Sequence, residues 1–140
     1  MNTDWLEVFD VTGSGYRPLI DFGAWGVAIF RFDEALRPDR IERLERHTAT
    51  DEIFVLLEGR AVLLLGGNSD SHGGLHSLVM EMGKVYDVRR NAWHAALLGA
   101  DASILLVENS DTGPQNTEFT PLGSEERAKV LELARRHSIP

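Results

Sequence analysis

The 140-residue sequence contains no cysteine. This absence excludes a disulfide framework, a zinc site built on thiolates and a cysteine nucleophile. Any metal ion would have to be bound by carboxylates and by the five histidines. The length suits one domain, residues 1–140, and allows a core large enough that neither a metal nor a disulfide is needed merely to fold.

Basic residues are also few: Lys and Arg number 14, only two of them lysine, and the net charge is −8. They form no stripe that would follow a phosphate backbone, so nucleic-acid binding is not expected. No apolar run approaches the roughly 20 residues of a membrane span. The acidic start "MNTDWLEVFD" has no signal-peptide pattern. We therefore expect a soluble, cytoplasmic protein without a membrane partner.

Short apolar runs recur along the chain between Gly, Asp, Asn and Pro. Their length and their content of Val, Ile, Leu and Phe are typical of β-strands. The predicted strands are residues 7–11, 25–32, 52–59, 60–67, 76–82, 84–88, 92–98 and 102–109. Regular spacing of such short strands predicts an all-β sandwich or barrel over about residues 7–109.

Turn residues divide these runs. Gly59 can take the positive φ of a tight hairpin turn. Residues 66–75 have the composition of a flexible loop, and residues 12–16 predict only a turn. Residues 33–47 fit either a short helix or a strand with alternate residues on one face, and Pro38 blocks a longer helix.

The C-terminal residues 124–137 predict a single α-helix. Ser124 can cap it, and acidic residues in the first turn and basic residues in the last complement the helix dipole. An apolar stripe that begins at Ala128 predicts that the helix packs on the outside of the β body. Residues 110–123 are then a linker.

Two histidines lie beside apolar strands, His47 and His94. Glu52 begins the most apolar stretch and shares a strand face with Phe54. A carboxylate on such a face needs a hydrogen bond, an ion pair or a metal ion. Two imidazoles and a carboxylate can bind Fe(II), Mn, Ni or Zn and leave positions open for a substrate; the alternative is a set of satisfied polar residues. The other histidines are expected at the surface: His72, His76 and His137.

Two stretches resemble the motifs of the cupin superfamily. "HTATDEIFVLLEG" (47–59) resembles the second half of the first motif, and "GKVYDVRRNAWH" (83–94) has the spacing of the second. Proline and glycine normally stand where this chain has Arg89 and Asn91, and asparagine can adopt the left-handed conformation that glycine supplies. Over about residues 25–109 the chain resembles small single-domain bacterial cupins. The resemblance implies a cupin jelly roll, with a strand ending near His47.

Metal-binding cupins usually begin the first motif with H-x-H, whereas this chain has Glu45 at the first histidine position. The resemblance aligns the other positions and implies a metal set of Glu45, His47, Glu52 and His94. Two carboxylates beside two histidines favour Mn, Fe, Zn or Ni. The alternative reading of Glu45 is an exposed charge within "RIERLERH".

Three further residues are predicted to border the pocket: Tyr86, Phe54 and Arg31. Tyr86 lies close to the second motif. Arg31, like Arg17 elsewhere in the chain, can bind an anionic substrate, although a surface ion pair is the default role of both. Trp93 precedes the inward-facing His94, so it is expected to face outward into packing or a dimer contact.

Three functions stay open at this stage. The leading one is a metal-dependent cupin enzyme acting on a small polar molecule such as a sugar or organic acid, with isomerase, lyase, decarboxylase and dioxygenase chemistry all possible on this fold. The second is a non-catalytic ligand-binding cupin. The third is a metal-free isomerase or epimerase that uses His47 or His94 as a general base. Edge strands that need covering predict a homodimer.

Overall fold

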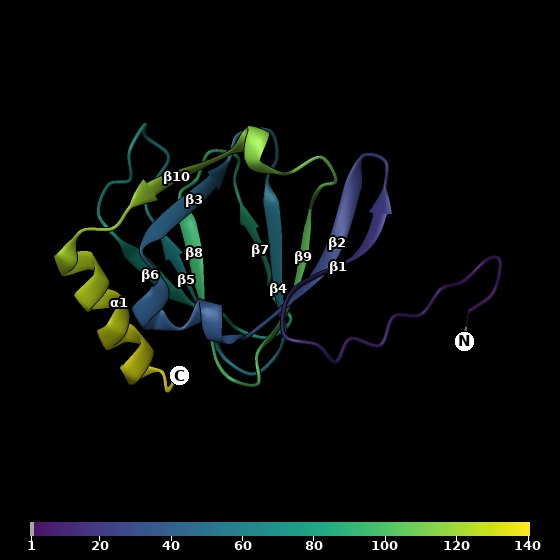
Figure 1. Ribbon diagram of the computed structural model, residues 1–140, viewed down its shortest axis with the longest axis horizontal. Helices are drawn as coiled ribbons and strands as arrows, with labels where there is room; N and C mark the ends of the chain where they lie inside the picture. Colours follow the sequence, from purple (N-terminus) through teal and green to yellow (C-terminus); the bar gives the residue numbers. More distant parts are fainter. Residues whose placement is uncertain (1) are drawn as a thin grey trace.

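The computed structural model describes residues 2–140, which form a sandwich of two five-stranded antiparallel sheets and a C-terminal helix (Figure 1). The strand orders are β1–β2–β9–β4–β7 and β10–β3–β8–β5–β6. The bounds are β1 Gly15–Phe22, β2 Trp25–Arg31, β3 Arg43–His47, β4 Glu52–Glu58, β5 Ala61–Leu65, β6 His76–Val79, β7 Val85–Val88, β8 His94–Leu98, β9 Ser103–Asn109, β10 Thr117–Pro121 and α1 Ser124–Arg136. The predicted all-β sandwich with a C-terminal helix is confirmed.

Two apolar cores hold these layers together. The first lies between the sheets and includes Phe54 and Leu56 of β4 opposite Leu63 of β5. The second lies between the outer face of the second sheet and α1, where Trp93 and Val130 are buried. Strand β5 is apolar throughout because one face serves each core, in keeping with the period of two along a strand. Trp93 faces away from the site, as predicted.

The N-terminal part differs from the sequence prediction. Residues 7–11 form no strand and are mostly exposed, and Figure 1 shows this segment extending away from the sandwich. The predicted strand is wrong because its apolar residues have no partner strand. Conversely, the predicted turn at residues 12–16 is wrong in part, because Gly15 and Tyr16 already belong to β1, which pairs with β2 at the sheet edge.

The predicted linker 110–123 is also wrong in part, because it contains β10. This strand pairs with β3, with Thr117 opposite His47. The helix begins at Ser124, but its N-cap is Gly123, whose N–H donates to the Glu126 side chain. Ser124 is therefore the first helical residue and not the cap. Within residues 2–140, no helix is long and apolar enough to cross a membrane.

Two turns have the backbone conformation that the sequence predicts. Gly59, between β4 and β5, has φ +73°, and a Cβ there would come within 2.7 Å of the Ala102 nitrogen. Asn91 has φ +69°, and its N–H donates to the His47 carbonyl at 2.9 Å. The ambiguous segment 33–47 contains two single 3-10 turns and then β3, which ends at His47. The hydrogen bond from Asn91 to His47 thus joins the two cupin-like motifs.

Candidate metal centre

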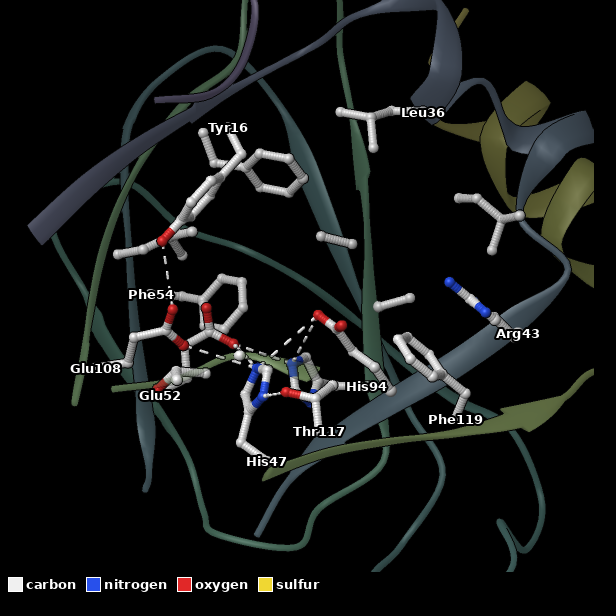
Figure 2. A pocket seen from close by; sticks show the side chains of 18 of the residues that line it. Tyr16, Leu36, Arg43, His47, Glu52, Phe54, His94, Glu108, Thr117 and Phe119 are labelled. Carbon is white, nitrogen blue, oxygen red and sulfur yellow. Dashed lines mark hydrogen bonds and ion pairs between the residues drawn. The ribbon is translucent and has the colours of Figure 1, made fainter. Parts of the chain in front are cut away.

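Four predicted ligands come together between the two sheets. Strand β3 supplies Glu45 and His47, while Glu52 and His94 are the first residues of β4 and β8. Pairing of β3 with β8 sets Glu45 opposite His94, and β4 brings its carboxylate from the other sheet. One ligand atom from each of the four lies within 4.8 Å of all the others. Figure 2 shows the side chains of His47, Glu52 and His94 converging.

The Glu52 carboxylate is the centre of this cluster. Its Oε1 lies 3.1 Å from His47 Nε2 and 3.0 Å from His94 Nε2. The Glu45 Oε1 is farther, 3.9 Å and 3.8 Å from the same two nitrogens. Since the Glu45 side chain is 41% exposed and that of Glu52 only 7%, Glu45 lies on the side of the cluster that is open to the cavity.

Both imidazoles are held so that Nε2 points into the cluster. His94 Nδ1 donates to the Ala92 carbonyl at 2.9 Å, and His47 Nδ1 lies 3.0 Å from the Thr117 hydroxyl. A carbonyl oxygen only accepts, so His94 Nδ1 carries a proton, and its Nε2 becomes a ligand once the proton shared with Glu52 Oε1 has left. This arrangement is the one that orients metal-binding histidines.

Protonation in the cluster follows from its charges. Burial opposes ionisation of Glu52, but hydrogen bonds from His47 and His94 outweigh it and lower the Glu52 pKa to about 2. Burial likewise favours neutral imidazoles, yet the hydrogen bond and the charge of Glu52 raise the pKa of both histidines. Since a cation competes with such protons for the same nitrogens, the donor set fits a divalent ion.

A third carboxylate, Glu108 of β9, was not predicted. Its Oε2 lies 3.7 Å from His47 Nε2 and, among residues 2–140, has no hydrogen-bond partner although it is buried. The Tyr16 hydroxyl donates to its Oε1 at 3.4 Å. Burial and the Glu52 charge raise the Glu108 pKa to about 7, and burial and Glu108 raise the Tyr16 pKa to about 12. In the sequence, Glu108 stands two residues after the apolar Leu106 and therefore on the same strand face, which was the signal that could have identified it as a site residue.

The cluster lines a cavity of about 640 Å³. Phe54 lines it, as predicted, whereas Tyr86 and Arg31 do not. Tyr86 lies on the edge strand β7, packs against the inter-sheet core and accepts a hydrogen bond from the Glu81 N–H. Arg31 ends β2 on the far side of the sheet. Lining residues that the sequence prediction missed include Tyr16, Arg43, Glu108, Thr117 and Phe119.

The remaining histidines differ from one another. His76 is exposed, as predicted. His72 is not: its side chain is 11% exposed, with Nδ1 3.1 Å from the Thr120 hydroxyl and Nε2 2.8 Å from the Glu126 carboxylate. It joins the loop 66–75 to α1, so the surface prediction for His72 is wrong. His137, just after the helix, is half-buried. None of the three contacts the cluster.

Comparison with known proteins gives likenesses in structure alone. No family profile and no curated protein matches the sequence. The capsular polysaccharide assembling protein CapF from Staphylococcus aureus is similar over 85% of this chain and 33% of that one (16% identity, TM-score 0.55). KdgF from Halomonas sp. is similar over 71% of this chain and 81% of its own, with 13% sequence identity and a TM-score of 0.51. A cupin-2 domain containing protein from Shewanella frigidimarina is similar over 72% of this chain and 84% of its own, with 16% sequence identity and a TM-score of 0.47.

Identities this low show the fold and leave the activity open. The chain has a cupin-like fold of two packed sheets, which it shares with KdgF and with part of CapF and which its two motifs imply. Within that fold it carries a buried cluster of two histidines and two glutamates that is suitable for a metal ion.

Proposed function

We propose that this protein is a divalent-metal cupin enzyme that acts on a small polar molecule in the cavity. The observation that carries the proposal is the convergence of four donor atoms within 4.8 Å in the wall of a 640 Å³ cavity. His47, His94, Glu52 and Glu45 would hold Mn, Fe, Ni or Zn. When bound, such an ion supplies a Lewis acid beside the substrate.

The chain's own residues have separable roles in this proposal. Ala92 and Thr117 orient the two imidazoles, and the half-exposed Glu45 leaves the cluster open toward the cavity. Tyr16 fixes one oxygen of Glu108, which leaves Glu108 Oε2 to accept a proton from a bound molecule or return it. The apolar walls exclude water and strengthen these electrostatic interactions.

A specific observation also supports a metal-free enzyme as the second candidate. Glu52 Oε1 already lies within hydrogen-bond distance of both imidazoles, so the polar groups satisfy one another without an ion. A histidine beside a buried carboxylate is a common general base. This candidate predicts activity that chelators leave unchanged, and a non-catalytic binding cupin predicts affinity without turnover.

Elemental analysis of untagged protein tests the metal proposal. We expect close to one Mn, Fe, Ni or Zn per wild-type chain, and the content should fall at least about tenfold in His94→Ala because a ligand is lost. The control is His76→Ala, which removes an exposed histidine of β6 that belongs neither to the cluster nor to the cavity lining. His47→Ala/His94→Ala that folds and keeps its metal would refute the site. A wild type that takes up no metal on reconstitution would favour the metal-free enzyme.

A further inference from the structure

Strand β3 carries a third charged group into the cavity. Residues two apart on a strand face the same side and lie about 6.6 Å apart, and Arg43, Glu45 and His47 all line the cavity. Leu44 and Arg46 face the opposite side, where Leu44 is fully buried under the helix and the Arg46 guanidinium lies over Trp93. The strand therefore places a cation roughly 13 Å along the cavity wall from His47.

Arg43 is exposed and stacks on an aromatic ring, without a counter-ion among residues 2–140. Its guanidinium lies 3.6 Å from the centre of the Phe119 ring, on the paired strand β10. Among residues 2–140 it makes no ion pair, whereas Arg46 on the other face pairs with Glu118 at 2.8 Å. Stacking on an aromatic ring orients the planar group and leaves its N–H edge free. Figure 2 shows Arg43 and Phe119 on the side of the cavity away from Tyr16 and Glu108.

Apolar side chains line much of the rest of the cavity. The walls include Phe30, Leu36, Ile41, Phe54 and Leu106. Arg40 lines the cavity as well and is exposed, so it adds to the attraction of anions toward an otherwise acidic protein. The cavity thus has a cationic side at Arg43, apolar walls, and an end of imidazoles and carboxylates.

From these three zones we propose that the cavity binds a small monocarboxylate, whose carboxylate pairs with Arg43 while a hydroxyl or carbonyl oxygen reaches the cluster of Glu45, His47, Glu52 and His94. This inference rests on the proposed function and adds its substrate class. A single planar guanidinium matches a planar carboxylate through two parallel hydrogen bonds. The carboxylates of the cluster disfavour the more highly charged phosphate group, and the apolar walls suit the carbon segment between the two polar ends.

Ligand-detected NMR and calorimetry with matched ligands test this assignment. The probes are short hydroxy and oxo monocarboxylates, each compared with its neutral amide and with a phosphate ester of the same alcohol. We expect wild type to bind the acid at least about tenfold more tightly than the amide, since a charge-assisted pair is lost with the amide. Arg43→Gln should abolish this preference, and Arg43→Lys should keep part of it.

The control variant is Arg17→Gln, an exposed arginine of β1 outside the cavity lining, which should bind like wild type. Equal binding of acid and amide, tighter binding of the phosphate ester, or no binding of any acid to folded wild type would overturn the assignment. Titrations of chelator-treated protein separate the two proposals. An acid preference that depends on Arg43, in wild type that takes up no metal on reconstitution, keeps this inference and refutes the metal role, whereas a loaded metal site with no acid preference does the reverse.

Discussion

At the scale of single residues, the two buried carboxylates Glu52 and Glu108 have opposite protonation behaviour. Glu52 receives hydrogen bonds from two imidazoles, and its pKa is lowered to about 2 despite burial. Glu108 is buried beside that negative charge, and its pKa is raised to about 7. Pairs of titratable groups whose environments separate their pKa values in this way are characteristic of acid–base sites. The environment, rather than the residue type, sets the two roles.

Glu108→Gln should change how stability depends on pH. The Glu108 pKa is about 7 in the folded protein against 4.5 as the ordinary value, so the folded state binds this proton more tightly. Stability from this group is therefore lost as pH rises from about 4.5 to about 7. Thermal unfolding of metal-free protein should show a smaller loss over this range in Glu108→Gln than in wild type. Glu58→Gln, at the exposed end of β4, is the control. Parallel profiles for wild type and Glu108→Gln would contradict the prediction.

Asn91 links the two cupin-like motifs through a strained backbone position. At φ +69°, alanine costs about 1 kcal/mol or more and glycine costs nothing extra. Asn91→Ala should therefore lower the free energy of unfolding by about 1 kcal/mol in urea titrations, while Asn91→Gly should match wild type or exceed it. A stable Asn91→Ala variant together with a destabilised Asn91→Gly variant would show that the asparagine side chain, and not the backbone, matters here.

At the scale of elements, the central strands were predictable from sequence because their burial is encoded locally. In β4 the buried residues are Glu52, Phe54 and Leu56, which alternate with more exposed neighbours. In β5 the apolar run is continuous because both faces are covered. Each pattern is bounded by turn residues, and Gly59 between them has the positive φ that a tight turn needs.

The edge strands could not be predicted in this way. Strand β1 is exposed at most of its positions, and β10 buries only Thr120. Each exists because a partner strand, β2 or β3, offers its hydrogen bonds. Residues 7–11 have the better apolar pattern but no such partner, so they stay outside both sheets.

The same distinction applies to the site. Its four predicted ligands occupy motif positions whose spacing reflects strand alternation and turns, so sequence alone placed them. Arg43 and Phe119 meet only because β10 pairs with β3, and Tyr16 meets Glu108 only because β1 and β9 flank β2. Contacts that depend on the pairing of distant strands carry no local signal.

At the scale of the whole molecule, apolar residues are exposed on β6 and β7, the edge strands of the two sheets, and on the turn that connects them. Val79 of β6, Met82 in the following turn and Val85 of β7 are 48%, 65% and 67% exposed. Strands β6 and β7 are the edges of their sheets, and unprotected edges of this kind favour pairing with another chain. This region is where we expect the homodimer that the sequence predicts.

Val85→Lys should weaken that dimer. A lysine on an edge strand opposes edge-to-edge pairing, so we expect the dimerisation constant measured by sedimentation velocity to weaken at least about tenfold, which corresponds to about 1.4 kcal/mol. Leu131→Lys, an exposed position on α1, should leave association unchanged. A wild type that is monomeric at all accessible concentrations would exclude the dimer.

The alternation along β3 places residues that can set ligand preference on one face of the strand and residues that stabilise the fold on the other. Its odd-numbered residues, such as Arg43, face the cavity, and its even-numbered residues, such as Leu44, hold the sheet against the helix. A substitution at position 43 therefore alters recognition without opening a void in either core. Mutation can shift ligand preference along this strand at little cost in folding, so related chains are free to diverge in specificity while they keep the same scaffold.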